Sequence, residues 1–419
     1  MNTRHLSGLM LSVGIISFSG LAQQLGNPIR SDPGVGARAI AMAGSYTALS
    51  ADPGGMFWNP AGLCFSTRPQ ASVSISGLQP AVETVFHSRQ KSYESEDKNT
   101  RFRIGNVGLV MPLSKCSPAP AFGFGFQNPY ITDVLLSYKT GQTGDGTIHN
   151  MDNQFISLGQ LSFWTVSGAL PLSRRFSFGI SASFITGDEI NEILLAESTV
   201  SDSGSINSEQ HLNYSRDYRG YDVRFGLMIR PQDNVSFGAR LELPATVAFE
   251  EFGVEMTDNR EYSKEYVLHG TLKSYYKASC GAAFLLENLV FSTEVYTRVP
   301  RPKKSVRDHC GSFKSGGSVG VELRPRDGAI SLRGGYGWDE YDPTPYRVSY
   351  KEDVLVGDLP RSESPSGIHN LGAGFQWEIS DRGMIAASYG MRFYTLETEG
   401  VLQENHQLQH GIVECTLRF

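Results

Sequence analysis

The feature that most constrains the fold is a period-2 alternation of apolar and polar residues, which recurs along the chain from residue 70 onward. In 176–184, phenylalanine, isoleucine and alanine occupy every second position, and serine or glycine fills the positions between. Segments 235–243, 330–338 and 413–419 follow the same scheme. Successive side chains of a strand point to opposite faces, so each segment predicts a strand with one apolar face. Such strands suit either a soluble sandwich or a lipid-facing barrel.

The lengths of the connections favour the barrel. Counting the alternating segments gives about fourteen strands, beginning near residues 70, 103, 120, 157, 176, 220, 235, 266, 289, 317, 329, 366, 384 and 410. Short turns near 172–175, 231–234, 324–328 and 380–383 alternate with long polar segments, predicted as loops, near 79–101, 130–155, 188–218, 250–264, 299–316, 339–365 and 396–408. Short turns at one end and long loops at the other are typical of outer-membrane barrels. The sequence therefore predicts an all-β, 14-stranded antiparallel outer-membrane β-barrel over residues 70–419.

Composition is consistent with this class. Only 19% of the 419 residues are charged and 45 are glycine, while the formal net charge of −6 argues against nucleic-acid binding. After residue 22 no apolar run is long enough for a transmembrane helix. Charges on the polar strand faces are expected to pair across strands inside the barrel: Arg240, Glu242, Glu322, Arg324, Arg333, Arg392, Glu414 and Arg418.

The two ends of the chain indicate export to the outer membrane of a diderm bacterium. Residues 1–22 combine a short basic start, an apolar stretch and small residues near Ala22, which predicts a signal peptide cleaved before Gln23. The terminal segment Leu417-Arg418-Phe419 resembles the signal read by the outer-membrane barrel assembly machinery. That machinery and outer-membrane lipid are the expected macromolecular partners.

Residues 23–69 show no strand alternation. Ala37–Ser50 predicts a short helix interrupted by Gly44, and Asp52-Pro53-Gly54-Gly55 ends it. A segment of this size before the first strand is too small to fold alone. It is expected to pack inside the barrel as an N-terminal hatch, or plug.

The amino-acid sequence of this segment is similar to that of a known family. Gly36-Ala37-Arg38-Ala39, Ala48-Leu49-Ser50-Ala51-Asp52 and Trp58-Asn59-Pro60-Ala61-Gly62-Leu63 resemble the FadL/TodX outer-membrane transporters of long-chain fatty acids and other hydrophobic compounds. The resemblance implies a fourteen-stranded barrel with a hatch, and it extends to FadL-like branches such as the PorV proteins of a secretion system.

The resemblance also points to the candidate gate. It implies that the turn at Asn59 lies near the ligand and that its displacement opens a route, although Asn-Pro is also a common turn former. The gate residues predicted are Phe57, Trp58, Asn59, Pro60 and Ala61. The pattern Gly34-Val35-Gly36-Ala37-Arg38-Ala39 formally matches a dinucleotide-binding loop, but the polar residues before it argue against that alternative.

The third strand is the candidate for a lateral opening. Pro129 cannot donate to a sheet ladder and glycines weaken a wall, so a bulge or kink is expected there. The residues concerned are Gly123, Gly125, Asn128 and Pro129. In the family, a kink in this strand opens a lateral gap toward the membrane; alternatively, Pro129 only ends the strand at the outer rim.

A basic cluster in an otherwise acidic chain is the candidate for anion capture, or else a solvated loop. Its members are Arg298, Arg301, Lys303, Lys304 and Arg307. The five cysteines show neither metal-site spacing nor a disulfide framework. No metal, cofactor or enzymatic activity is expected.

The function implied is passive uptake of hydrophobic molecules, namely fatty acids, gated by the hatch. The alternative is a non-transporting FadL-like or PorV-like barrel that docks exported proteins. A polar porin is disfavoured by the plug. Apolar residues lining the lumen mouth and the predicted loop 188–218 would favour transport.

Overall fold

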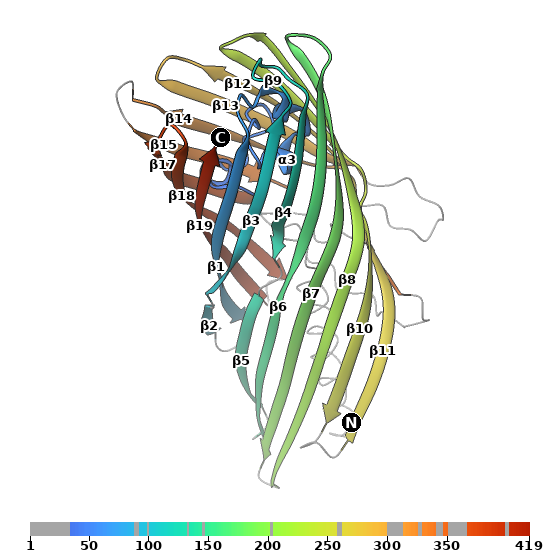
Figure 1. The fold of residues 1–419 in the computed structure, drawn as a ribbon. Coiled ribbons are helices and arrows are strands. Elements are labelled where there is room, and N and C mark those ends of the chain that lie inside the picture. The colour runs from blue at the N-terminus through green and yellow to red at the C-terminus, as the bar shows by residue number, and fades with distance from the viewer. Residues whose placement is uncertain are drawn as a thin grey trace.

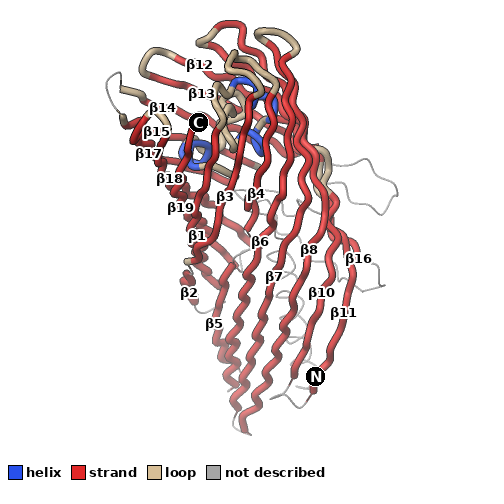
Figure 2. Tube along the Cα trace, in the orientation of Figure 1, coloured by secondary structure: helices blue, strands red, loops and turns tan. Residues whose placement is uncertain are grey.

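The computed structural model shows a tall β-barrel with short helices inside one end (Figures 1 and 2). It describes residues 34–87, 92–98, 100–131, 134–144, 147–201, 204–257, 262–299, 313–325, 329–340, 347–350, 367–398 and 402–419. The predicted signal peptide, residues 1–22, lies outside this part of the chain.

The elements are short helices followed by strands. The helical elements are α2 (Ala37–Ala41), α3 (Gly55–Trp58) and the 3-10 helix η1 (Pro60–Phe65). The strands are β1 (Gln70–His87), β2 (Ser92–Lys98), β3 (Arg101–Pro112), β4 (Ala121–Ile131), β5 (Val134–Gly144), β6 (Thr147–Pro171), β7 (Phe176–Ser201), β8 (Gly204–Gln232), β9 (Val235–Glu242), β10 (Thr246–Thr257), β11 (Tyr262–Lys273), β12 (Tyr276–Leu285), β13 (Leu289–Val299), β14 (Lys314–Leu323), β15 (Ile330–Asp339), β16 (Arg347–Tyr350), β17 (Ile368–Ser380), β18 (Gly383–Thr398) and β19 (Leu402–Arg418).

These strands form a closed ring of fourteen. Antiparallel pairing runs in the order β1, β3, β4, β6, β7, β8, β9, β12, β13, β14, β15, β17, β18 and β19 and returns to β1. Four of the other strands continue ring members along the chain: β2 precedes β3, β5 follows β4, β10 follows β9 and β11 precedes β12. The remaining one, β16, pairs with β11. The strand number and the antiparallel arrangement predicted from the sequence are confirmed.

The prediction of long loops is largely wrong. Most of the described residues in the seven segments predicted as loops belong to strands. Examples are the far halves of β6, β7 and β8, which project away from the hatch at the opposite end of the barrel (Figure 1). Beyond the membrane both faces of a strand can meet water, so the apolar-polar alternation disappears. The backbone ladder does not need that alternation and continues.

The burial pattern is inverted relative to a soluble sandwich. Large apolar side chains are exposed on the outer face of many strands, for example Phe124, Val166 and Phe375. The intervening positions on the same strands are small or polar and are buried inside. An apolar exterior around a polar interior suits a barrel whose solvent is lipid.

The predicted charge pairing inside the barrel is present. Glu322 and Arg333 are direct cross-strand partners on β14 and β15, with Arg333 Nε 2.8 Å from Glu322 Oε2. Arg240 Nη2 also lies 3.1 Å from Glu242 Oε1, although these two residues share one strand, β9. Both pairs are shielded from solvent. Paired charges satisfy one another where an isolated charge would be costly.

Candidate functional site

The hatch fills the barrel at the end that carries the short turns. Figure 1 places α3 near the C-terminus and the ends of β12 and β13, and Figure 2 shows all helices at this end. Almost every residue from Val35 to Ser66 is buried or half-buried. Since outer-membrane barrels carry their short turns on the periplasmic side, we place the hatch in the periplasmic half of the lumen.

The helix predicted over residues 37–50 is much shorter in the structure. The helix α2 ends at Ala41, and the next turn contains Ala43 at φ 51° and Gly44 at φ 84°. These left-handed conformations cannot continue an α-helix. The chain then packs Gly44 against the ring of Trp58, so packing within the hatch overrides the local helix propensity.

Glycines on the inner wall provide the seat of the hatch. A Cβ added to Gly179 would lie 2.4 Å from Ala61 N, and one added to Gly238 would lie 2.3 Å from Thr47 O. The glycines whose added Cβ would come within 3.0 Å of a hatch atom are Gly108, Gly123, Gly125, Gly179, Gly226, Gly238, Gly320, Gly335, Gly372 and Gly374. Hatch atoms therefore come close to the wall backbone on eight ring strands, and on five of them, β7, β8, β9, β15 and β17, the near atoms include hatch backbone.

Two of these glycines were predicted to weaken the third strand. Gly123 and Gly125 lie on the inner face of β4, and both face Met56 of α3. A Cβ on either would come 2.7 Å from Met56 side-chain atoms. Their clearest role in the structure is thus to make room for the hatch.

Wall side chains also bind the hatch backbone. Ser177 Oγ donates to Ala61 O at 2.9 Å, Ser181 Oγ to Met56 O at 2.8 Å, and Ser292 Oγ to Ser45 O at 2.9 Å. These carbonyls would otherwise be buried without partners, because the helices of the hatch are too short to satisfy them. The hatch is held by hydrogen bonds as well as by its shape.

Asn59 is the central connection of the predicted gate. It is fully buried, its Nδ2 donates to Thr47 O at 2.8 Å and to Leu227 O of β8 at 3.0 Å, and its Oδ1 accepts from Ala61 N at 3.1 Å. The last bond caps η1, which Pro60 begins. Asn59 therefore joins two parts of the hatch to each other and to the wall.

The two aromatic residues before Asn59, Phe57 and Trp58, pack against each other, the rest of the hatch and the wall. Trp58 Nε1 donates to Val35 O at 2.8 Å, and the Trp58 ring meets the Phe57 ring edge-on at 5.4 Å. The guanidinium of Arg224 lies 4.0 Å from the centre of the Phe57 ring. Phe57 and Trp58 thus pack next to Asn59 and η1, and the role of these residues, with Pro60 and Ala61, as a gate stays a prediction.

A buried charge network grips the same part of the hatch. Arg224 and Arg240 both donate to Phe57 O, at 3.0 and 3.3 Å. Glu294 Oε2 accepts from Tyr46 N at 3.1 Å and from Thr47 N at 2.9 Å. Charged groups make the stronger kind of hydrogen bond in such surroundings. The sequence indicated internal charges but not their attachment to the hatch.

The wall is interrupted beside the hatch. The ladder between β3 and β4 covers Asn106–Pro112 and Ala121–Gln127, and no pairing between these two strands follows in the described residues on the extracellular side. At this height β4 has a register shift between Gln127 and Tyr130. The bulge expected at Asn128 and Pro129 is therefore present, and it lies within the wall because β4 continues to Ile131.

The side chain of Asn128 bridges the interrupted wall. Its Nδ2 donates to Ile104 O of β3 at 2.7 Å, and its Oδ1 accepts from Ser162 Oγ of β6 at 2.6 Å. Arg103 of β3 reaches β6 as well, with Nη1 2.9 Å from Gly159 O. Side chains thus replace the missing backbone ladder at the lateral break.

An apolar cluster lines the lumen directly behind this break. It consists of buried inward-facing residues of β4, β6, β7, β8, β10 and β11, together with Ala245 in the connection before β10: Tyr130, Leu161, Phe163, Ile185, Tyr218, Ala245, Val247, Phe249 and Leu272. The sequence analysis missed this cluster, although only Tyr130 and Tyr218 lie in segments predicted as loops. Apolar residues on the inward parity, such as Ile185 beside Gly187, were the available signal.

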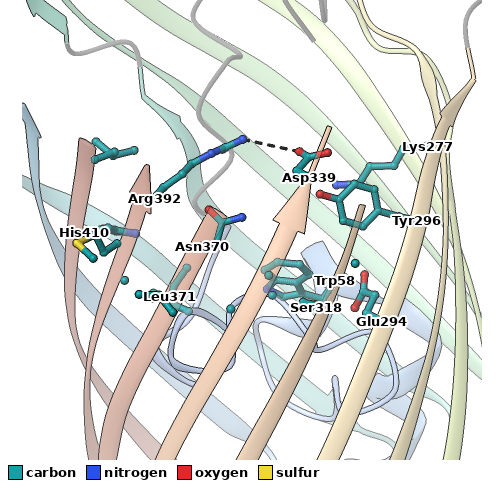
Figure 3. A pocket seen from close by; sticks show the side chains of 18 of the residues that line it. Trp58, Lys277, Glu294, Tyr296, Ser318, Asp339, Asn370, Leu371, Arg392 and His410 are labelled. Atoms are coloured by element: carbon teal, nitrogen blue, oxygen red, sulfur yellow. Dashed lines mark ion pairs between the residues drawn. The ribbon is translucent and has the colours of Figure 1, made fainter. Parts of the chain in front are cut away.

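A cavity of about 100 Å³ lies on the extracellular side of the hatch (Figure 3). Its floor includes Ile40 and Trp58 of the hatch, and its wall carries both apolar and charged side chains. Arg392 and Asp339 form the ion pair drawn in Figure 3, at 3.8 Å. His410 is buried at the edge, and neither ring nitrogen has a hydrogen-bond partner in the described part of the chain. We call this space the outer cavity.

One residue of the predicted anion-capture cluster lines the outer cavity. Arg298 is the last residue but one of β13 and pairs with Asp339, with Nη2 2.7 Å from Oδ2. The other predicted members lie outside the described residues: Arg301, Lys303, Lys304 and Arg307. Anion capture by this cluster therefore stays a prediction.

A second cavity, of about 240 Å³, lies on the periplasmic side of the hatch. Arg38 of α2 lines it, whereas Ile40 of the same helix lines the outer cavity. Arg38 Nε lies 2.7 Å from Glu322 Oε2. Burial would lower the pKa of Arg38, but the adjacent Glu322 carboxylate raises it above its ordinary value. The hatch thus lies between the two cavities. The ion pair between Arg38 and Glu322 anchors it to the wall.

The described residues offer no other chemistry. They contain no group of three or more potential metal ligands, and the cysteines among them, Cys64, Cys116, Cys280 and Cys415, are free thiols. No helix in the described ranges is long and apolar enough to cross a membrane.

A closed fourteen-stranded ring, an apolar exterior and an internal plug define the fold of hatch-containing outer-membrane β-barrels. Neither a protein-family model nor a curated protein matches the sequence. Solved structures do match: the toluene transporter TodX of P. putida has a TM-score of 0.64 at 14% identity, covering 93% of this chain and 99% of its own. A Pseudomonas aeruginosa FadL homologue has a TM-score of 0.61 at 12% identity, covering 92% and 98%. The monoaromatic hydrocarbon channel CymD has a TM-score of 0.57 at 13% identity, covering 93% and 98%.

The chain therefore has the FadL/TodX fold of bacterial outer-membrane barrels, as the sequence resemblance implied. At these identities the likeness concerns the fold.

Proposed function

We propose that the protein is an outer-membrane channel for passive uptake of hydrophobic molecules, with the hatch as its gate. The observation that carries this proposal is the apolar cluster that begins at Tyr130, directly behind the lateral break at Asn128 and Pro129. A channel for polar solutes gains nothing from a dry apolar wall beside a break that faces lipid. A hydrophobic ligand would move along this wall and leave laterally without crossing bulk water.

For the ligand, we propose an amphiphile with an anionic head group, namely a long-chain fatty acid. The outer cavity contains the cations Lys277, Arg298 and Arg392 and the carboxylates Glu294 and Asp339, which leaves an excess of positive charge. TodX and CymD are described as a toluene transporter and a monoaromatic hydrocarbon channel. An uncharged aromatic would use the apolar cluster but would gain little from these charges.

Binding of radiolabelled lauric acid and of radiolabelled toluene to the purified protein tests both levels of the proposal. Phe249→Gln adds a polar group to the apolar cluster and is expected to weaken both ligands about tenfold or more, since a buried aromatic contributes ~1.5–3 kcal/mol. Phe252→Gln is the matched control, because Phe252 lies on the same strand but faces outward. Arg392→Gln is expected to weaken laurate but not toluene.

The alternative function is docking of exported proteins. Absence of saturable binding of both ligands, together with co-purification of an exported protein, would contradict the transport proposal. Saturable toluene binding without laurate binding would retain the channel and exclude the fatty acid.

A further inference from the structure

Glu294 lies where the outer cavity meets the hatch. It belongs to β13, is 2% exposed and lines the cavity. Figure 3 shows its carboxylate beside Trp58 and Ser318, below Tyr296 and Lys277. One oxygen, Oε2, accepts both hatch amides described above, Tyr46 N and Thr47 N. The same side chain thus faces the outer cavity and holds the hatch.

The other oxygen of Glu294 lies near Arg240, a second wall residue that is hydrogen-bonded to the hatch. Oε1 lies 3.8 Å from Arg240 Nη2. Arg240 in turn donates to Phe57 O, and Glu242 and Ser279 fix its guanidinium. A change in the charge or position of Glu294 therefore acts on the hatch directly at residues 46–47 and through Arg240 at residue 57.

A continuous set of hydrogen bonds links Glu294 to the candidate gate. Thr47 gives its N–H to Glu294, and its carbonyl accepts from Asn59 Nδ2. The same amide nitrogen of Asn59 donates to Leu227 O of the wall. Release of Thr47 from Glu294 would therefore also disturb the bond that keeps Asn59 in place.

We propose that Glu294 is the positioning residue that couples occupancy of the outer cavity to release of the hatch. The coupling rests on the proposed function, since an anionic head group beside Lys277 and Arg298 comes close to the Glu294 carboxylate. Like charges repel strongly in a poorly solvated site, and a second anion competes for Arg240. Both effects weaken the hold on Tyr46 and Thr47 only when the cavity is occupied.

The hatch contains a native reporter for this test. Cys64 of η1 is fully buried, so a maleimide reaches it only when the hatch is displaced. Replacement of Cys116, Cys280, Cys310 and Cys415 by serine leaves Cys64 as the single thiol. Its labelling rate is measured in the purified barrel at neutral pH, without ligand and with saturating lauric acid.

Glu294→Gln keeps an acceptor but loses the charge, and charged hydrogen bonds are roughly twice as strong as neutral ones. We expect labelling without ligand to rise about tenfold, with no further rise on adding laurate. The control is Glu251→Gln, which changes a buried wall carboxylate of β10 that pairs with Arg216 and does not line the outer cavity. It is expected to label within about twofold of the wild type without ligand and to keep the acceleration by laurate.

Unchanged labelling in Glu294→Gln, with an intact response to laurate, would overturn the inference. So would wild-type protein that binds laurate saturably while its Cys64 labelling ignores the ligand, and this result would leave the proposed function standing. Absence of saturable laurate binding would count against the proposed ligand, and the ligand-free comparison would still decide whether Glu294 holds the hatch. Heat-modifiable migration in gels verifies folding; if Glu294→Gln fails that criterion, Glu294→Asp, which keeps the charge but shortens the reach to both amides, provides the test.

Discussion

Replacement of Asn59 by alanine is the most direct test of how the hatch is held. The Asn59 side chain makes three hydrogen bonds in a fully buried position, two within the hatch and one to the wall. Each contributes about 1 kcal/mol net when its partner cannot turn to water. Asn59→Ala should therefore favour the displaced hatch by ~3 kcal/mol, which corresponds to an increase of about 150-fold in its population.

Hydrogen exchange of the hatch amides measures that population. The amides to follow include Phe57 N, bonded to Gly54 O at 3.0 Å, and Gly62 N, bonded to Asn59 O at 3.0 Å. Exchange from a locally opened state scales with the population of that state. The barrel strands should keep the exchange rates of the wild type, because the ring closes through backbone ladders that do not involve the hatch.

Asn191→Ala is the matched control. Asn191 on β7 is also fully buried, but neither its Nδ2 nor its Oδ1 has a hydrogen-bond partner among the residues that the structure describes. Its replacement removes the same atoms without breaking a bond, so hatch exchange should stay within about threefold of the wild type. Equal hatch exchange in the two variants would refute the argument that the Asn59 hydrogen bonds hold the plug.

Three further perturbations test other parts of the molecule. Gly179→Ala places a Cβ 2.4 Å from Ala61 N and should destabilise the seated hatch by ~1–3 kcal/mol. The displaced hatch should be seen as a larger single-channel conductance. The control Gly168→Ala has nothing within 4 Å of its added Cβ and should leave the conductance unchanged. Asn128→Ala removes the side chain that bridges β3 and β6 at the lateral break. If this bridge keeps the break closed, its loss of ~1 kcal/mol should raise laurate uptake into liposomes several-fold. Slower uptake would contradict that role of Asn128. Burial raises the pKa of the Cys64 thiol to about 12, so the folded hatch keeps a proton that the unfolded hatch loses near pH 9. The folded hatch should therefore lose stability as pH rises from about 9 toward 12. Hydrogen exchange of the hatch amides that does not depend on pH, after correction for the intrinsic rate, would contradict this.

The sequence by itself determined the strands and their number. Alternation in segments such as 176–184 depends only on neighbouring residues and on the presence of lipid outside the barrel. It can therefore be recognised in the sequence without knowledge of the tertiary structure. The bulge at Pro129 was predictable for the same reason, because a missing amide hydrogen is a local property. The alternation failed beyond the membrane, where water on both faces no longer selects apolar residues.

Only the tertiary structure decided what holds the plug and where a ligand can go. Gly179 faces Ala61 and Glu294 accepts from Thr47 because ring closure fixes the register of strands that are more than a hundred residues from the hatch. The apolar cluster behind Asn128 likewise brings together residues of six strands. Contacts of this kind depend on which inner-face positions reach the same height in the closed barrel, and no local pattern of residues encodes that height.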